Sequence, residues 1–172
     1  MLREQIAASL EQAFSKSGFA EPSVAQLRTA CNVSLRTLYK HYPSKEAMIV
    51  AALEFRHQRY LTFLHYPSAT TGVESVLHIF DRLEQWMQQY APHGCLSMNA
   101  IAAFPDNLLI NNAVKEHKKA VRQFLGQQSR REDLATAVFL LHEGVSSAWP
   151  VLGRNAVTTA QQTLRLLLKE HQ

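Results

Sequence analysis

The stretch of sequence that most constrains the fold is SVAQLRTACNVSLRTLYKHYPSKEA, residues 23–47. Ser23 can cap a first short helix, and the polar run at 31–34 then interrupts the helical pattern. A second short helix over 35–41 must stop directly after His41, because Pro43 disfavours helical backbone in the residue before it. Two short helices joined by a tight turn predict a helix-turn-helix, whose second helix enters the major groove of DNA.

The second helix of this motif has a basic face. Leu38 and Tyr42 lie four residues apart and can both face inward, which leaves Arg36 and Lys40 on the outside. Between Pro22 and Lys45 the sequence has no Asp or Glu. A small surface of this kind can approach phosphates without repulsion between like charges. The motif therefore predicts contact with double-stranded DNA.

The run SGFAEPSVAQLRTACNVSLRTLYKHYPSKEAM, residues 17–48, resembles the DNA-binding domain of the TetR family of transcriptional regulators. That family has a Gly-aromatic pair, a capped helix and the pattern G-V-S-x-x-T-L-Y before a final Lys-Glu pair. Asn32 stands where the family usually has glycine at the turn, and Arg36 stands where many members have glycine. Asparagine tolerates left-handed backbone, so we expect the turn to form. Leu35 and Arg36 are expected to change which bases are read.

The resemblance also implies roles for individual residues. Thr37, Tyr39, His41 and Lys45 match family positions that contact phosphates or bases, and Leu35, Arg36 and Lys40 match positions that read base edges. Arg36 is the best candidate to read a guanine, because a guanidinium can bond O6 and N7 together. Tyr39 can instead be a packing residue, and His41 can simply cap its helix. The expected DNA contacts are Arg28, Leu35, Arg36, Thr37, Tyr39, Lys40, His41 and Lys45.

The rest of the chain predicts a helical body. Apolar residues recur at helical spacing over 2–17, 45–64, 73–90, 95–104, 107–127, 132–151 and 156–169, with a loop at 66–72. We expect an all-α fold of about nine helices, with a DNA-binding domain at 1–47 and a ligand-binding and dimerisation domain at 48–172. His57, Arg59 and His65, and the polar run 115–119, are expected on solvated faces.

Composition agrees with a DNA-binding head on a helical body. Of 172 residues, 47% are hydrophobic, which is enough for a substantial core. Residues 1–60 contain eight Lys or Arg against five Asp or Glu, so the basic excess lies in the head. The two cysteines have no CxxC spacing, and no apolar run approaches the roughly 20 residues that span a bilayer. We expect a cytoplasmic protein.

Two central segments carry a second resemblance. HGCLSMNAIAAFPDN and NNAVKEHKKAVRQFL are similar to helices of a TetR subfamily with a G-C-L-x-x-N-A signature, in which these helices wall a ligand cavity. Such a cavity is expected to be mostly apolar with a few polar anchors, and a plain core remains the alternative. The candidate pocket residues, mostly large or polarizable side chains, are Trp86, Cys95, Met98, Asn99, His117, Val121, His142 and Trp149.

The last two predicted helices show more apolar surface than one chain's core needs, which predicts half of a four-helix homodimer interface. A dimer predicts a palindromic operator with half-sites about one helical turn apart. The resemblance implies a repressor that a small, largely apolar effector releases from DNA. No HExxH, Gly-rich phosphate loop or GxSxG occurs, so we expect no enzyme, metal or cofactor. The alternative is a helical adaptor that binds protein through the helix-turn-helix.

Overall fold

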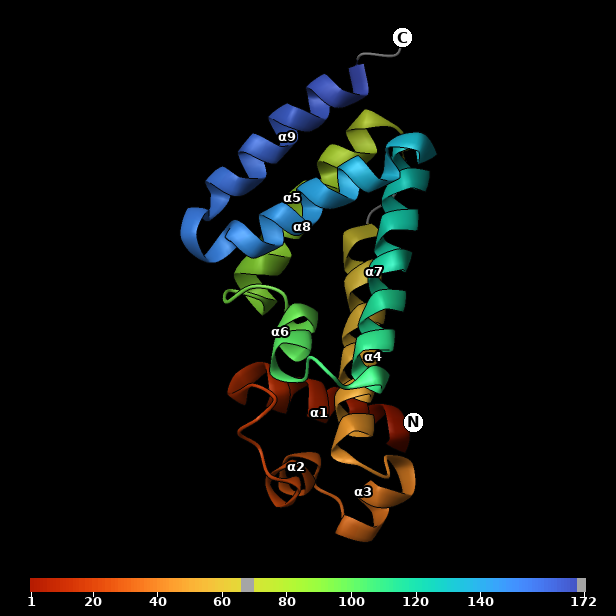
Figure 1. Ribbon diagram of the computed structural model, residues 1–172, viewed down its shortest axis with the longest axis vertical. Coiled ribbons are helices and arrows are strands. Elements are labelled where there is room, and N and C mark those ends of the chain that lie inside the picture. Colours follow the sequence, from red (N-terminus) through yellow and green to blue (C-terminus); the bar gives the residue numbers. More distant parts are fainter. Residues whose placement is uncertain (66–69, 170–172) are drawn as a thin grey trace. The chain divides into compact units, whose positions relative to one another are not determined.

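The computed structural model describes residues 1–65 and 70–169, and the predicted loop at 66–72 lies partly outside these ranges. Within them all regular structure is helical, which confirms the all-α prediction with an N-terminal helix-turn-helix (Figure 1). The chain divides into two compact units, each described separately below. Unit 1 comprises residues 1–59 and 96–117, and unit 2 comprises 60–95 together with the chain from 118 onward.

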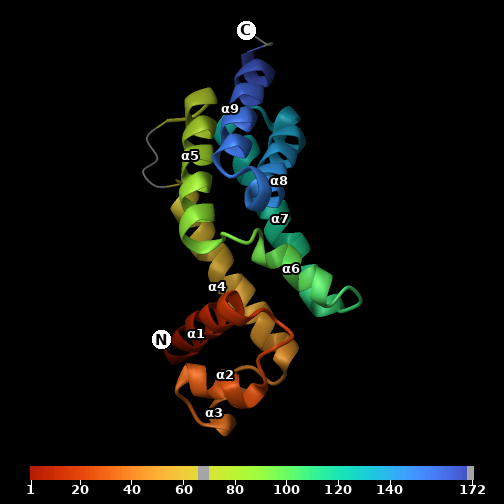
Figure 2. The same cartoon turned by 90° about the vertical axis from the view of Figure 1, so that its left-hand side faces the viewer.

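Unit 1 contains α1 (Leu2–Ser17), α2 (Val24–Cys31), α3 (Leu35–His41) and α6 (Leu96–Ala103). It also takes the first part of α4 (Lys45–His65) and of α7 (Leu108–Ser129). Figure 2 shows α1, α2 and α3 grouped around the start of α4. The side chains that fill the centre of the unit are aliphatic or aromatic: Ile6, Leu10, Phe14, Phe19, Leu27, Leu38, Met48, Ile49, Leu53, Ile110 and Val114.

Local capping sets the bounds of α2 and α3. Ser23 forms a capping box with Gln26: the Ser23 hydroxyl accepts from the Gln26 amide, and the Gln26 side chain accepts from the Ser23 amide. Asn32 ends α2 in the left-handed region, with φ 51° and ψ 44°, as expected for asparagine in the place of glycine. Ser34 then caps α3, which ends before Pro43. The turn between the two helices is thus built from local hydrogen bonds.

Unit 2 contains α5 (Val73–Tyr90), α8 (Ala135–Leu152) and α9 (Arg154–Lys169), with the remaining parts of α4 and α7. A one-turn 3-10 helix, Glu132–Leu134, joins α7 to α8. Helices α8 and α9 run side by side in opposite directions, and α5 packs against both (Figure 1). The most deeply buried side chains of this core are Phe80, Leu83, Leu64, Leu125, Val76, Val138 and Leu164.

Most predicted helix bounds agree with the structure to within three residues, and 73–90 and 35–41 agree at both ends. Three expectations about exposure were wrong. Arg59 is paired with Glu11, and His57 stacks on His117, so neither is simply solvated. His117 is buried although it lies in the polar run 115–119.

Candidate functional site

Helix α3 presents its predicted contact residues to solvent. Leu35 and Tyr39 are 45% and 41% exposed, and Arg36 and Lys40 are also exposed. Thr37 and His41 are half-buried. Leu38, on the opposite face, is fully buried. The helix therefore has one face fixed in the core and one face available to a partner.

Local hydrogen bonds hold the start of α3. The Ser34 hydroxyl accepts from the Thr37 amide at 3.0 Å and lies 2.8 Å from the Thr37 hydroxyl. The last turn is held differently, because the Tyr42 hydroxyl donates to the Arg3 carbonyl at 2.9 Å. The Arg3 guanidinium also lies 5.5 Å from the centre of the Tyr42 ring. These contacts tie both ends of a seven-residue helix, which alone would be too short to be stable.

The two predicted contacts outside α3 lie in different settings. Arg28 is exposed on α2. Lys45, the first residue of α4, donates from Nζ to the Ala20 carbonyl at 3.2 Å. Ser44 accepts from the Ala47 amide at 3.1 Å, so it caps α4. Lys45 thus also fastens the loop between α1 and α2.

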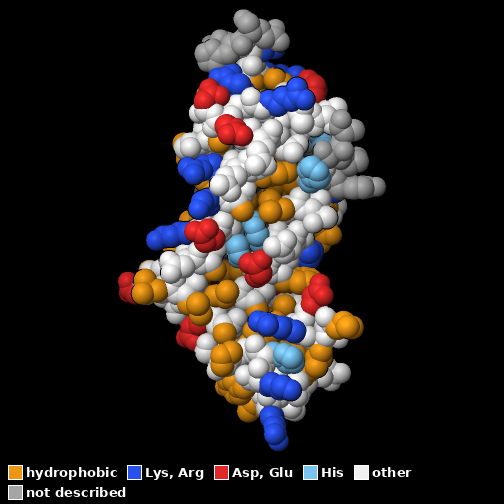
Figure 3. Space-filling model, turned by 90° about the vertical axis from the view of Figure 1, so that its right-hand side faces the viewer, with side chains coloured by type: hydrophobic (Ala, Val, Ile, Leu, Met, Phe, Trp, Pro, Cys, Tyr) orange, Lys and Arg blue, Asp and Glu red, His pale blue; other side chains and the backbone are white. Residues whose placement is uncertain are grey.

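Between Pro22 and Lys45 the charged side chains are all basic. Lys, Arg and His side chains gather at the end formed by α2 and α3 on the face drawn in Figure 3. The nearest acidic residues in the sequence are Glu21 and Glu46, which flank the motif. A polyanion can therefore approach α3 without meeting a carboxylate within the motif itself.

A buried ion-pair cluster fastens α1 to α4, and sequence reasoning missed it. Glu11 is 5% exposed and accepts from Arg56 at 2.6 Å through Oε1 and from Arg59 at 2.6 Å through Oε2. Arg56 is 8% exposed and also donates to the Ser15 hydroxyl. Because a buried carboxylate needs its charge compensated, this cluster fixes the orientation of α4 against α1.

The eight predicted pocket residues do not fall in one unit. Trp86, Cys95, Val121, His142 and Trp149 belong to unit 2, whereas Met98, Asn99 and His117 belong to unit 1. Met98 is 45% exposed and Asn99 is exposed on α6. Cys95 is half-buried, and His142 is 1% exposed. Trp86 and Val121 belong to the apolar core of unit 2, Trp149 packs against it, and His142 is buried on α8.

A chain of polar side chains crosses the core of unit 2. Lys118 Nζ donates to both Glu143 oxygens at 2.8 Å and lies 3.4 Å from Cys95 Sγ. His142 bonds Glu143 through Nδ1 at 3.0 Å and the Tyr60 hydroxyl through Nε2. Sequence reasoning singled out Cys95 and His142 but missed the other three, because their pairing depends on residues far apart in the chain.

Burial and charge tune the protonation of this chain. Burial lowers the pKa of His142, more than its hydrogen bond to the Glu143 carboxylate raises it. Burial alone would raise the pKa of Glu143, but His142 and Lys118 outweigh it and hold that pKa at about 2. Burial would lower the pKa of Lys118, but Cys95 and Glu143 outweigh it and raise the value. The arrangement is thus an ammonium-carboxylate pair beside a neutral imidazole.

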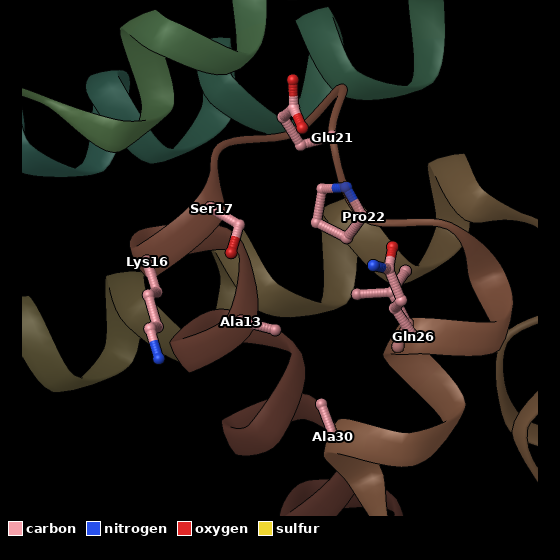
Figure 4. A pocket seen from close by; sticks show the side chains of 8 residues that line it. Ala13, Lys16, Ser17, Glu21, Pro22, Gln26 and Ala30 are labelled. Atoms are coloured by element: carbon pink, nitrogen blue, oxygen red, sulfur yellow. The ribbon is translucent and has the colours of Figure 1, made fainter.

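A shallow pocket of about 300 Å³ opens on unit 1 between the C-terminal end of α1 and α2 (Figure 4). Its walls combine an apolar floor with a polar rim and consist of Ala13, Lys16, Ser17, Glu21, Pro22, Gln26, Leu27 and Ala30. None of the predicted effector contacts lines it. Over residues 1–65 and 70–169, no cluster of three or more His, Cys, Asp or Glu side chains could hold a metal ion. Across the same residues no helix has the length and apolar character that would span a bilayer.

Comparison with known proteins agrees with this geometry. The family model described as "Bacterial regulatory proteins, tetR family" matches residues 6–52, which contain α1 to α3 and the start of α4. The transcriptional regulator UidR of Escherichia coli K12 is 24% identical over 128 residues, 74% of this chain. The chain spans 64% of the length of that relative. The uncharacterized regulator YerO of Bacillus subtilis is 32% identical over 53 residues, covering 31% of this chain and 18% of YerO.

Solved structures share the fold. SCO4454, a TetR-family transcriptional regulator from Streptomyces coelicolor, has a TM-score of 0.84 at 16% identity, covering 98% of this chain and 89% of its own. The reduced form of NemR from E. coli has a TM-score of 0.78 at 22% identity, covering 98% and 97%. Regulators of this kind bind DNA and are not enzymes, which agrees with the prediction that the chain has no catalytic activity. The helix-turn-helix region of this chain thus matches the TetR family of bacterial regulatory proteins in sequence, and the fold along the chain is the one that solved TetR-family regulators have.

Proposed function

We propose that this protein is a cytoplasmic, ligand-responsive repressor that binds a palindromic operator as a homodimer. In this proposal residues 1–47 bind DNA, and residues 48–172 bind the effector and form the dimer. The observation that carries the proposal is the exposed, acid-free face of α3, where Arg36 and Lys40 stand clear of the core. A face of that kind suits a groove lined by phosphates and base edges.

The proposed DNA contacts fall into two groups. Leu35, Arg36 and Lys40 read base edges. Backbone contacts come from the remaining candidates, which are Arg28, Thr37, Tyr39, His41 and Lys45. The exposure of Leu35 and Tyr39 supports their assignment, because large apolar side chains on a small helix are otherwise placed in the core.

A homodimer is supported by apolar surface on the last two helices. Leu140, Gly144, Ser147 and Val151 lie on one exposed stripe of α8, at spacings of four, three and four residues. On α9, Leu166 is 68% exposed. Small residues within such a stripe let two helices approach closely, and a second copy of α8 and α9 completes a four-helix bundle.

The effector is proposed to be small and largely apolar. The predicted contacts in unit 2 carry the best support, because Trp86, Val121 and Trp149 offer apolar contact area while Cys95 and His142 offer polar atoms. Sites for small molecules in proteins commonly combine these two kinds of lining. Met98, Asn99 and His117 remain predictions of the sequence.

A gel-shift titration with the DNA that flanks the protein's own gene tests the proposal as a whole. Specific binding should appear at nanomolar protein, on the order of 10³ or more tighter than binding to unrelated DNA. Binding no tighter than to unrelated duplex would reject the proposed operator function. It would favour the adaptor alternative, in which α3 binds protein.

Two substitutions separate base reading from backbone contact. Arg36→Ala should cost about 1 to 3 kcal/mol on the preferred sequence and relax the preference at one base position. Lys45→Ala should weaken binding to all sequences alike and flatten the dependence on salt. Because Lys45 also donates to the Ala20 carbonyl, Lys45→Gln serves as a control that keeps a hydrogen-bond donor but removes the charge. Equal loss of selectivity in both variants would reject the assignment.

A further inference from the structure

The shallow pocket between the C-terminal end of α1 and α2 depends on two alanines. Ala13 of α1 and Ala30 of α2 both point into it, below the ring of Pro22 (Figure 4). The buried residues Pro22 and Leu27 complete an apolar floor. The pocket volume of about 300 Å³ is at the small end of the range for ligand sites. Since a water molecule takes about 30 Å³ in the liquid, this space suits a ligand of about ten non-hydrogen atoms.

The loop that forms one wall of the pocket, residues 18–22, is anchored at several points. Phe19 is buried, and its ring centre lies 5.2 Å from that of Phe14. The Ala20 carbonyl accepts from Lys45 Nζ at 3.2 Å. The capping box of α2 follows the loop directly. Because these contacts already hold the wall in place, a ligand does not have to order it, and the entropic cost of binding is smaller.

The rim of the pocket carries one charge of each sign. Lys16 and Glu21 are both exposed, and within residues 1–65 and 70–169 neither side chain takes part in an ion pair or a hydrogen bond. In Figure 4 the two side chains lie at different edges of the pocket. Exposed side chains change rotamer rapidly, so both charged groups can turn over the opening.

Two uncharged polar groups lie between the floor and the rim. Ser17 and Gln26 stand on opposite sides of the pocket (Figure 4). The Ser17 hydroxyl can donate or accept, and Gln26, whose side-chain oxygen accepts from the Ser23 amide at 2.8 Å, keeps its NH2 group for a further partner. An apolar floor below donors, an ammonium and a carboxylate complements a small molecule that has one apolar group and both charges.

We propose that this pocket binds a free amino acid with an apolar side chain. The ligand's side chain lies on the floor, its carboxylate binds Lys16, and its ammonium group binds Glu21. A peptide terminus has only one of these two charges, and a fatty acid lacks the ammonium group, so neither satisfies both edges of the rim. None of the proposed effector contacts lines this pocket, and the inference does not depend on the proposed operator or effector.

Two-dimensional NMR of the isotope-labelled full chain tests the site, with L-leucine as the probe. Saturable shifts are expected at the amides of residues 13–30, with a Kd on the order of 1 mM, because a shallow site leaves part of the ligand in solvent. Isocaproate is leucine without the ammonium group, and isoamylamine is leucine without the carboxylate. Each should bind at least about fivefold more weakly than leucine. The absence of saturable shifts at 13–30, or equal binding by the three compounds, would overturn the proposal.

Substitutions test where the probe binds. Ala30→Leu fills the pocket and should abolish the shifts at 13–30, whereas Ala25→Leu, an exposed change on α2 outside the pocket, should bind leucine as the wild type does. Glu21→Gln keeps the size of the side chain but removes its charge, and this test does not need Ala30→Leu to fold. Leucine should bind this variant at least about fivefold more weakly, while isocaproate, which has no ammonium group, should bind it unchanged. The proposal fails if Ala30→Leu still binds leucine, or if Glu21→Gln weakens both compounds equally.

Discussion

Polar side chains in the interior of unit 2 determine one another's protonation states. Glu143 accepts from Lys118 and His142, and these contacts hold its pKa at about 2, below the ordinary 4.5. A carboxylate with a depressed pKa stabilises the fold above its unfolded pKa, and that contribution is lost as the pH falls through the folded pKa. Glu143 should therefore matter at neutral pH and lose its importance between about pH 4.5 and about pH 2.

Glu143→Gln tests this dependence. At about pH 7 the variant should be less stable than the wild type by on the order of 3 kcal/mol, because Lys118 loses its counter-charge. The gap should narrow as the pH falls from about 4.5 to about 2, because Glu143 takes up a proton in the unfolded chain at a higher pH than in the folded protein. Urea denaturation followed by circular dichroism at several pH values measures this difference in the free energy of unfolding. Glu74→Gln, an exposed change on α5, is the control and should show little loss. A gap that is constant with pH would contradict the assignment.

Sequence reasoning placed apolar residues better than charged ones. Leu38 is buried and Arg36 is exposed, as the four-residue spacing predicted. Both Arg59 and His117 were assigned to solvated faces, but Arg59 is only partly exposed and His117 is buried. Their partners are distant: Arg59 binds Glu11, 48 residues away, and His117 binds Glu54, 63 residues away. The periodicity of one helix does not contain such pairings, because they arise only when two helices pack together.

At the scale of elements, the junction between α7 and α8 depends on one glycine. Gly126 lies in the last turns of α7, and a Cβ atom added there would be 2.7 Å from Ala135 Cβ. Both atoms are attached directly to helix backbone, so neither side chain can rotate away. The close approach explains why glycine, a poor helix former, occupies this position.

Gly126→Ala should therefore destabilise the protein by about 1 to 3 kcal/mol, although alanine favours helix more than glycine does. Adding Ala135→Gly should remove the overlap, so the double variant should be more stable than the sum of the two single changes predicts. Thermal unfolding of the wild type, the two single variants and the double variant gives the coupling energy between positions 126 and 135. Additive effects, or a stabilised Gly126→Ala variant, would show that the helices separate easily at this point.

At the junction between α7 and α8, the helix bounds could not be fully predicted from the sequence. Helices bounded by strong signals were placed correctly, such as 35–41 between Ser34 and Pro43. The segment 132–151 was predicted as one helix, whereas a 3-10 turn at Glu132–Leu134 precedes α8. The Arg131 side chain binds Asp133 there, and the Ser129 hydroxyl accepts from the Arg131 amide. These short-range polar contacts compete with α-helical hydrogen bonding. The segment also lacks an apolar periodicity from which the 3-10 turn could have been predicted.

At the scale of the whole molecule, the exposed stripe on α8 bears on assembly. Leu140 is 63% exposed and Val151 is 85% exposed, and both belong to a helix that also buries Val138, His142 and Val145. Exposed apolar side chains that recur at helical spacing favour contact with another helix, whereas isolated ones need no explanation. In the proposed homodimer each copy covers the stripe of the other. Two recognition helices are then joined in one particle, which is what a palindromic operator requires.

Leu140→Glu should therefore separate the proposed dimer, because it places a carboxylate in an apolar interface without a partner. Sedimentation at micromolar concentration should show a dimer for the wild type and a monomer for the variant, with unchanged helix content. Leu108→Glu is the matched control: Leu108 is 77% exposed but lies on α7 in unit 1, so this variant should remain dimeric. The monomer should also bind operator DNA at least about a hundredfold more weakly, because only one helix reaches a groove. A Leu140→Glu protein that still sediments as a dimer would place the interface elsewhere on the chain.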